Sequence, residues 1–337
     1  MLKDTLNILS KLTLGKVINA LNVFISYYLS RITGSSQHTG LPISLSIEPT
    51  TACNLRCPEC PSGLRSFNRP TGKMDIALLN TILKQVKAHC TYINFYFQGE
   101  PYLHPQFLDM VKLCGSHGIY SATSTNAHFL NSDKAKATVE SGLDRIIISI
   151  DGTDQNTYES YRKEGNLDKV IEGTKNIVHW KKALKSSTPH VIFQFLVVRP
   201  NEHQIEEVKQ LGKELGVDEV KFKTAQIYDF ENGNDLIPTN DRFSRYRQNS
   251  TGKWEIKNPL DDHCWRMWSG AVITWDGRVV PCCFDKDAQH SMGNLTTNSF
   301  SEIWNNKAYR RFRASILKSR SEVEMCKNCS EGTEVWG

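Results

Sequence analysis

The stretch Ser141–Gly152 reads SGLDRIIISIDG, and it carries the pattern on which the fold rests. Gly142 precedes an apolar run, and Asp151 follows the run. Glycine tolerates the left-handed backbone of a helix C-cap, and a continuous apolar run is typical of a strand buried on both faces. We therefore predict that a helix ends near Gly142 and that residues 145–151 form an interior strand of a parallel sheet.

The same order of glycine and apolar run recurs at Gly118 and Gly216. Apolar runs separated by helical patterns predict parallel strands with helices outside. Six such units favour an α/β fold with a partial (β/α)6 TIM-like barrel over an open doubly wound sheet. The predicted strands span residues 43–49, 92–98, 120–126, 145–151, 191–198 and 219–225.

Polar loops follow the first five strands, and functional residues of such folds collect at the C-terminal ends of the strands. The loop after the first strand contains CNLRCPEC, with Cys53, Cys57 and Cys60 within eight residues. The next cysteines, Cys90 and Cys114, lie toward the ends of predicted helices, where we expect packed thiols. The first cluster therefore has three ligands, whereas a tetrahedral metal site has four.

The N-terminus has no signal-peptide core, so we expect a cytoplasmic protein whose cysteines bind metal rather than form disulfides. Three thiolates can hold a [4Fe–4S] cluster and leave one iron open, which is typical of a reactive site. CNLRCPEC resembles the cluster motif of radical S-adenosylmethionine (SAM) enzymes, in which SAM chelates the open iron. The resemblance extends over residues 43–225.

This resemblance implies reductive cleavage of SAM to a 5′-deoxyadenosyl radical, which abstracts a hydrogen atom from the substrate. QGEP resembles the motif that contacts the SAM amino group, and STN and SIDG resemble strand ends that hold its ribose and carboxylate. Two positions depart from the family: Glu59 stands where an aromatic residue is common, and Gln98 replaces a glycine. Arg162 is either a partner of the SAM carboxylate or a solvated arginine at a helix end. The expected SAM-binding residues are Gly99, Glu100, Ser124, Asn126, Ser149, Asp151 and Arg162.

A second set of cysteines lies near the C-terminus. Asp276-Gly277 between two apolar runs predicts a hairpin that brings Cys264 and Cys282 together. Cys326 and Cys329 supply two further sulfurs, so zinc or an iron–sulfur cluster could fill the site. The spacing resembles the SPASM domain and its shortened form, Twitch, which implies one auxiliary [4Fe–4S] cluster. Cys283 is the alternative to Cys282, since neighbours along a strand point to opposite faces.

The first residues of the chain have helical periodicity, with Leu6, Leu9, Val17, Leu21, Phe24 and Tyr28 roughly on one side. We expect this face to pack on the main domain or on a dimer partner. Peripheral attachment to a membrane surface is the less favoured alternative. The expected organisation is an amphipathic segment at 1–40, the barrel at 41–225, a linker or substrate-lining segment at 226–262 and a hairpin-plus-helix cluster domain at 263–337.

Composition adds little to this assignment. A net charge of +5 and a mean hydropathy of −0.42 argue against an integral membrane protein and do not indicate nucleic acid as a partner. We expect an oxidoreductase that acts on a small sugar- or cyclitol-like metabolite, with a peptide or protein maturase as the alternative. A flavodoxin- or ferredoxin-type protein is the expected electron donor. The sequence identifies no catalytic base.

Overall fold

The computed structural model describes residues 2–333. The chain forms two compact units. The first unit comprises Cys53–Ser66 and Ala122–Asn258 together with the residues up to Thr5. The second unit comprises Leu6–Ala52, Phe67–Ser121 and the chain from Pro259 onward. Each unit is described by itself.

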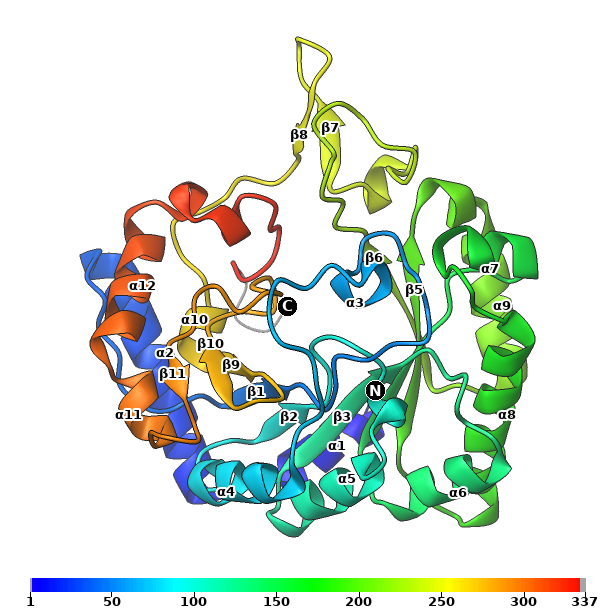
Figure 1. Ribbon diagram of the computed structural model, residues 1–337, viewed down its shortest axis with the longest axis horizontal. Coiled ribbons are helices and arrows are strands. Elements are labelled where there is room, and N and C mark those ends of the chain that lie inside the picture. The colour runs from blue at the N-terminus through cyan, green and yellow to red at the C-terminus, as the bar shows by residue number, and fades with distance from the viewer. Residues whose placement is uncertain (1, 334–337) are drawn as a thin grey trace. The chain divides into compact units, whose positions relative to one another are not determined.

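The first unit contains parallel strands with helices on one face (Figure 1). Strands β3, β4, β5 and β6 are neighbours in that order, and each pair is parallel. A two-stranded antiparallel hairpin, β7–β8, follows β6. The strands are β3 Tyr120–Thr125, β4 Arg145–Ser149, β5 His190–Val197, β6 Glu219–Thr224, β7 Tyr246–Gln248 and β8 Trp254–Ile256. The helices are α3 Pro61–Leu64, α6 Ser132–Glu140, α7 Gln155–Tyr161, α8 Leu167–Ala183, η2 Arg199–Gln204, α9 Ile205–Leu215 and η3 Asp241–Phe243.

The second unit joins the N-terminal and C-terminal parts of the chain through strand pairing. Strands occur in the order β11-β10-β9-β1-β2, and β1 pairs in parallel with both β2 and β9. The β9–β10 pair is antiparallel. These strands are β1 Ser44–Ile47, β2 Tyr92–Asn94, β9 Gly270–Ile273, β10 Arg278–Val280 and β11 Gly293–Asn294. The C-terminal hairpin therefore extends the sheet that begins at β1.

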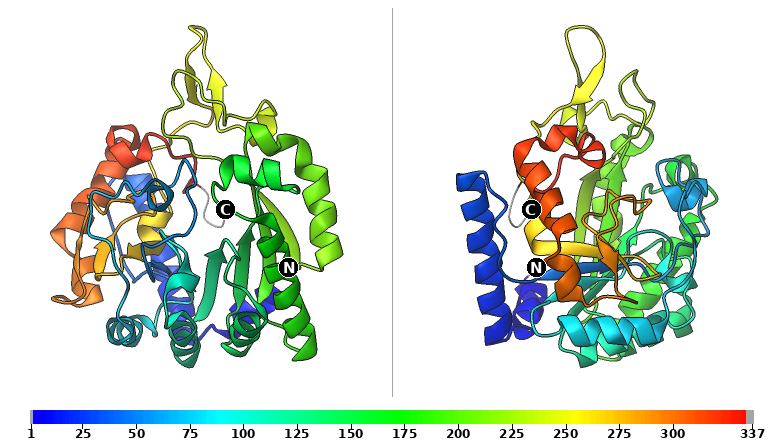
Figure 2. Two further views of the ribbon diagram at one scale, coloured as in Figure 1. Left: turned by 45° about the vertical axis from the view of Figure 1, so that its right-hand side comes forward. Right: turned by 60° about the vertical axis from the view of Figure 1, so that its left-hand side comes forward.

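Helices flank the strands of the second unit (Figure 2). Helix α2 lies beside α10 and buries Tyr27, whose ring packs edge-on against Trp265 and Trp268. The helices are α1 Leu2–Ser10, which begins in the first unit, α2 Leu14–Thr33, α4 Ile76–Val86, η1 Pro101–Leu103, α5 Phe107–Ser116, α10 Arg266–Ser269, α11 Phe300–Trp304, α12 Lys307–Lys318, η4 Arg320–Glu322 and η5 Glu324–Cys326.

The six strands predicted from the sequence are present as β1 to β6, although β2 is shorter than predicted. Gly118, Gly142 and Gly216 have φ angles of 65°, 77° and 76°, as the predicted helix ends require. Gly277, at the predicted hairpin turn, has a φ of 84°. The alternation of parallel strands with helices confirms the α/β partial-barrel class.

The apolar side of the N-terminal segment was expected to pack on the main domain or on a dimer partner, and the first of these two expectations is wrong. Five of the six residues named for that face, Leu6, Leu9, Val17, Leu21 and Phe24, are exposed. The side of α2 that is buried instead carries Lys16, Val23, Ser26, Tyr27 and Ser30. Periodicity shows that a helix has two different sides, but it does not say which side meets the protein.

Among the described residues, no single helix is both long and apolar enough to cross a membrane. The pair α1 and α2 passes that test of length and composition only when taken together, and the pair is bent by 104° at the break between the two helices.

Candidate functional site

The three cysteines of CNLRCPEC lie on the loop that leads into α3 in the first unit. Cys57 is buried, whereas Cys53 and Cys60 are partly exposed. The Cys60 amide donates to the carbonyl of Cys57 at 3.3 Å. A Cβ atom at Gly63 would lie 2.6 Å from the backbone nitrogen and oxygen of Cys57, so only glycine lets α3 approach the loop this closely. The local packing therefore holds the cysteine loop in a compact turn.

Arg162 is the cation beside this loop. Its Nη1 contacts the sulfur of Cys57 at 3.8 Å, and its Nε donates to the Asp151 carboxylate at 2.5 Å. Burial raises the pKa of the Cys57 thiol, and the guanidinium opposes that shift. Burial would lower the pKa of Arg162, but the negative charges of Asp151 and Cys57 raise it well above its usual value. The alternative that Arg162 is a solvated helix-end residue is wrong, since its side chain is only 17% exposed.

Two other expected SAM-binding strand ends also lie in the first unit. The Ser124 and Ser149 hydroxyls, on neighbouring strands β3 and β4, are 3.5 Å apart. Asn126 donates from Nδ2 to Oδ1 of Asn54 at 2.8 Å, and Asn54 stands between the first two cysteines. The end of β3 therefore contacts the cysteine loop directly.

The stretch after β6 packs against the same loop. Glu59 accepts a hydrogen bond from the Tyr228 amide at 2.9 Å. Tyr246 of β7 is buried, and its hydroxyl lies 2.8 Å from the Ile227 amide. An apolar cluster joins this stretch to the loop; its members include Leu55, Cys57, Ala225, Ile227, Ile237 and Tyr246, with Cys53, Cys60 and Trp254 packed against them. Residues 226–256 are therefore more than a surface linker.

Gly99 and Glu100 lie in the second unit, where they are held against the residues that precede Cys53. A Cβ at Gly99 would lie 2.2 Å from the Thr50 carbonyl oxygen, and the φ of Gly99 is 77°, so both packing and backbone require glycine. The Glu100 amide donates to the Ala52 carbonyl at 2.7 Å. The buried Glu100 carboxylate caps η1 by accepting from the Tyr102 amide at 3.2 Å.

The four predicted C-terminal cysteines line one cavity in the second unit. It has an empty volume of about 300 Å³, including open solvent. Cys282 lines the cavity, whereas Cys283 packs beside a small apolar cluster of Val272, Val280 and Ala288. The lining comprises Cys264, Cys282, Cys326 and Cys329 with Arg266, Met267, Phe284, Ile316, Arg320, Met325 and Glu331.

Two arginines stand among these sulfurs. Arg320, 1% exposed, donates from Nη2 to the sulfur of Cys329 at 3.2 Å. Arg266 contacts the sulfur of Cys283 at 3.7 Å and pairs with Glu331 at 2.7 Å. Burial raises the pKa of Cys326 to about 11, and Arg320 opposes this shift. Bound metal would replace the thiol protons of these cysteines, and the two arginines would offset the negative charge of the thiolates.

Four cysteines lining one cavity are a donor set that an iron–sulfur cluster can use. Among residues 2–333, no three His, Cys, Asp or Glu side chains are grouped as a single metal ion requires. A zinc ion bound by four cysteines lies about 2.3 Å from each of their sulfurs. In a cubane each thiolate binds a different iron, so its ligands stay further apart. The four cysteines of the C-terminal set line one cavity, as the ligands of one cluster would.

Comparison with known families agrees with this geometry. Residues 47–212 match the radical SAM superfamily, and residues 264–330 match SPASM, an iron–sulfur cluster-binding domain. Together the two segments span more than half of the chain. The chain belongs to the radical SAM superfamily and carries a C-terminal SPASM domain. It is therefore a [4Fe–4S]-dependent radical SAM oxidoreductase, and its cofactors are SAM and [4Fe–4S] clusters, as predicted.

Several named proteins resemble this radical SAM enzyme. The tungsten-containing aldehyde ferredoxin oxidoreductase cofactor-modifying protein of Pyrococcus furiosus is 26% identical over 85% of this chain and 86% of its own. The PqqA peptide cyclase of Gluconobacter oxydans is also 26% identical, over 88% and 85%. Among solved structures, SuiB of Streptococcus suis bound to S-adenosylmethionine has a TM-score of 0.64 at 15% identity, covering 88% of this chain and 73% of SuiB.

BtrN in complex with AdoMet and 2-DOIA has a TM-score of 0.53 at 20% identity, covering 86% of this chain and 94% of BtrN. At these identities the solved structures establish the fold alone. By their names, the two sequence relatives act on a cofactor and on a peptide, so similarity does not fix the substrate class of this radical SAM enzyme.

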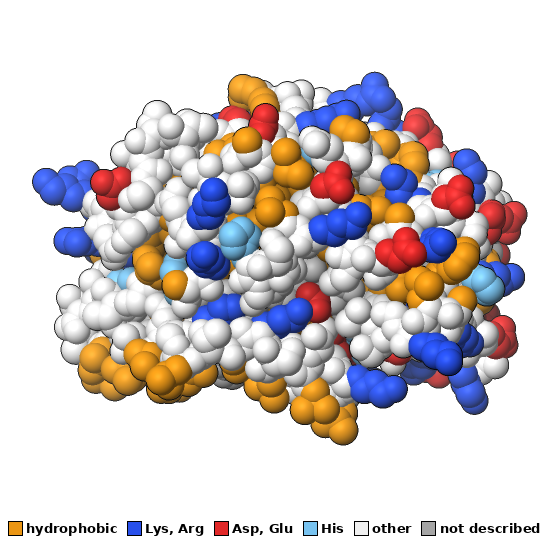
Figure 3. Space-filling model, turned by 90° about the horizontal axis from the view of Figure 1, so that it is seen from below, with side chains coloured by type: hydrophobic (Ala, Val, Ile, Leu, Met, Phe, Trp, Pro, Cys, Tyr) orange, Lys and Arg blue, Asp and Glu red, His pale blue; other side chains and the backbone are white. Residues whose placement is uncertain are grey.

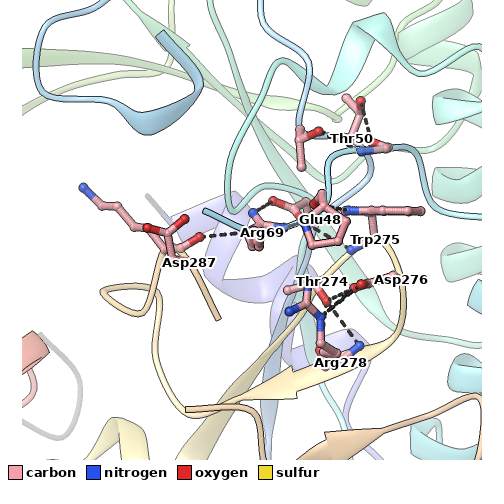
Figure 4. Close-up of polar contacts among 12 residues, drawn as sticks. Glu48, Thr50, Arg69, Thr274, Trp275, Asp276, Arg278 and Asp287 are labelled. Atoms are coloured by element: carbon pink, nitrogen blue, oxygen red, sulfur yellow. Dashed lines mark hydrogen bonds and ion pairs between the residues drawn. The ribbon is translucent and has the colours of Figure 1, made fainter. Parts of the chain in front are cut away.

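One buried ion pair in this radical SAM enzyme was missed by the sequence analysis. Arg69 donates from Nη1 and Nη2 to the two carboxylate oxygens of Glu48, at 2.8 and 2.5 Å (Figure 4). The same carboxylate accepts from the Trp275 amide at 3.2 Å, and Arg69 Nε donates to the Lys286 carbonyl at 2.9 Å. The pair thus links the end of β1 to the hairpin and the loop after Cys282. A lone Glu and a lone Arg carry no spacing signal that would have revealed it.

The expectation that Cys90 and Cys114 are packed thiols is confirmed. Cys90 and Cys114 are fully buried, and their sulfurs contact the carbonyls of Tyr92 and Ile119 at 3.4 and 3.7 Å. Burial raises the pKa of Cys90 to about 12, which keeps it a packed thiol at neutral pH.

Proposed function

We propose that this enzyme oxidises a carbinol carbon of a small polar, sugar- or cyclitol-like metabolite. The observation that carries the proposal is the cavity lined by Cys264, Cys282, Cys326 and Cys329. An oxidation that begins with hydrogen abstraction leaves a substrate radical with one more electron to lose. A cluster bound to these four cysteines would supply the acceptor for that electron.

The residues around the first cysteine motif have proposed roles in SAM binding. Cys53, Cys57 and Cys60 would hold the cluster with the open iron, which together with SAM supplies the 5′-deoxyadenosyl radical. Glu100 would accept from the SAM ammonium, because Gly99 lets the backbone turn tightly there. Ser124, Asn126 and Ser149 would contact the ribose and carboxylate.

Arg162 and Asp151 would act together in binding the SAM carboxylate. Asp151 is fully buried and also accepts from the Leu196 amide at 2.7 Å, so its carboxylate is fixed to the sheet. It therefore fixes the orientation of the guanidinium, and Arg162 offers its remaining N–H groups to Cys57 and to the SAM carboxylate. Asp151 is in this proposal a positioning residue rather than a direct SAM ligand.

The segment 226–256 would line the substrate pocket, since it packs on the cysteine loop within the same unit. It offers polar groups beside an apolar base: Tyr228 is 48% exposed, and Arg245 donates to the Thr224 hydroxyl at 2.8 Å. A flavodoxin- or ferredoxin-type protein would supply the electron that starts each turnover.

The alternative is a peptide maturase, which the similarity to the PqqA peptide cyclase favours. Both activities share SAM cleavage and differ in the hydrogen donor. The test is to incubate the reduced, reconstituted enzyme with SAM and a panel of carbinol-deuterated polyols and aminocyclitols. The proposal predicts deuterium in 5′-deoxyadenosine and a carbonyl product. Deuterium transfer from a labelled peptide and from no polyol would establish the maturase instead.

A further inference from the structure

The N-terminal helices carry most of the exposed large hydrophobic side chains of the described chain. All but three of these side chains lie within residues 2–32; the three others are Leu64, Leu184 and Tyr228. Seen from below, hydrophobic side chains gather along the lower edge of the molecule (Figure 3). We call the part of this surface on residues 6–33 the N-terminal apolar face; its members are Leu6, Leu9, Leu12, Leu14, Val17, Ile18, Leu21, Phe24, Ile25, Leu29 and Ile32.

Helix α2 turns its polar side inward and its apolar side outward. On the inner side, Ser30 donates to the Gln37 carbonyl at 2.6 Å and Tyr27 bonds His263 at 2.9 Å. On the outer side, Leu14, Ile18, Leu21, Ile25, Leu29 and Ile32 recur at intervals of three or four residues. Since α2 has 20 residues, the stripe runs for roughly 30 Å. A contiguous face of this size in water marks a site that something covers.

The charged residues near the face are basic, which favours binding to a negatively charged surface. Residues 5–47 contain no Asp or Glu, and their formal charges come from Lys11, Lys16 and Arg31. Lys16 is buried, with Nζ donating to the Gly118 carbonyl at 2.7 Å. Arg31 is exposed at one end of α2, and Lys11 is partly exposed just before the other end. Cations at both ends of an apolar stripe, with no Asp or Glu within residues 5–47, complement anionic headgroups.

The side-chain types favour lipid over a second protein copy. The residues that dominate protein–protein binding energy are enriched in Trp, Tyr and Arg, whereas Leu and Val are under-represented among them. The outer stripe of α2 consists of Leu and Ile, whereas its Tyr27 faces inward. Acyl chains need no directional partner, and the stripe offers no hydrogen-bonding group.

We propose that the N-terminal apolar face lies on the surface of an anionic lipid bilayer, with α2 parallel to the membrane plane. The sequence analysis favoured coverage of the apolar side by protein and gave peripheral membrane attachment as the less favoured alternative. The proposal is independent of the proposed substrate, because no member of the face lines the four-cysteine cavity or belongs to the apolar cluster at the first cysteine loop.

The test is flotation of the full-length, anaerobically reconstituted enzyme with vesicles of phosphatidylcholine alone or mixed with equal phosphatidylglycerol. We expect binding to the anionic vesicles, weaker binding in high salt, and a fall of about tenfold or more in partitioning for Leu21→Glu or Ile25→Glu. Leu184→Glu, at an exposed apolar position in the first unit, is the control and should bind as wild type. Reductive SAM cleavage should stay at the wild-type rate in all three variants.

Three outcomes would overturn the proposal. The first is failure of the wild-type enzyme to float with anionic vesicles. The second is flotation of both α2 variants to the same extent as wild type. The third is a wild-type enzyme that is a dimer by analytical ultracentrifugation, does not bind vesicles and becomes a monomer on Leu21→Glu substitution. That result would assign the face to a second copy.

Discussion

Arg320 places its Nη2 3.2 Å from the sulfur of Cys329, inside the wall of the four-cysteine cavity. The guanidinium also reaches the His263 carbonyl at 3.3 Å, so the protein holds it in place on more than one side. A fixed positive charge beside cluster thiolates stabilises the reduced, more negative cluster. Arg320 thus favours the acceptor role proposed for this site.

Replacing Arg320 with Gln should lower the reduction potential of the auxiliary cluster. Loss of one charge a few ångströms away should shift the potential by an amount on the order of 50–100 mV. For a one-electron couple, about 59 mV corresponds to a tenfold change in the reduction equilibrium. The measurement is a redox titration followed by electron paramagnetic resonance, in protein that lacks the first cluster. Arg320→Lys keeps the charge and should recover most of the shift. An intact cluster with the wild-type potential in Arg320→Gln would show that the contact has no electrostatic role.

The two cysteine sets should load independently. Anaerobic reconstitution is expected to give about eight irons per chain, as two cubanes. Replacing Cys53, Cys57 and Cys60 together with Ala should remove about four irons and abolish SAM cleavage. The check is iron and sulfide quantification per chain. Loss of all iron in that triple variant would mean that the auxiliary site does not hold a cluster of its own.

Glu100 tests the assignment of the SAM ammonium contact. Its carboxylate also caps η1 at Tyr102, so an Ala variant would lose two interactions at once. Glu100→Gln keeps an acceptor oxygen for the Tyr102 amide and removes only the charge. A charge-assisted bond contributes about 1.5–3 kcal/mol, so SAM affinity should fall roughly ten- to a hundredfold in this variant. Calorimetric titration with SAM gives the affinity, and an unchanged value would rule out Glu100 as the ammonium partner.

The Glu48–Arg69 pair makes a prediction about stability. Both side chains are almost fully buried, at 0% and 1% exposure, so Glu48→Gln leaves an uncompensated buried guanidinium. Breaking such a pair costs about 3–5 kcal/mol. The exposed pair Arg247–Glu255 is the control, because Glu255→Gln should change the free energy of unfolding by about 1 kcal/mol or less. Urea unfolding followed by circular dichroism compares the two, and equal midpoints would contradict the account of the buried pair.

The strands and turns were predictable because their signals are local. The apolar run at 145–151 and the left-handed glycine before it specify one strand and one helix end. Asp276-Gly277 likewise specifies a hairpin. The two cysteine sets could be singled out because thiolates at fixed short spacings have few other uses in such a protein.

Other features depend on contacts between distant segments. Nothing local to β9 indicates that it pairs with β1, since parallel strands have no common turn to fix their partner. The ion pair between Asp151 and Arg162 was not predicted, because the two residues lie on different elements and share no spacing motif. The side of α2 that faces the rest of the chain could not be predicted for a similar reason. The same periodicity fits a helix with either side inward, and the inner side is the one whose Tyr27 packs against Trp265 and Trp268.

The most direct test of the proposed oxidation uses the double variant Cys326→Ala, Cys329→Ala, with its fold checked by circular dichroism. The substrate is the polyol or aminocyclitol that transfers deuterium to 5′-deoxyadenosine, and the measured quantity is the molar ratio of carbonyl product to 5′-deoxyadenosine. The account predicts that SAM cleavage continues while the ratio falls from near one toward zero, because the second electron loses its acceptor. A folded variant that keeps the wild-type ratio would contradict the electron-acceptor role of the four-cysteine site.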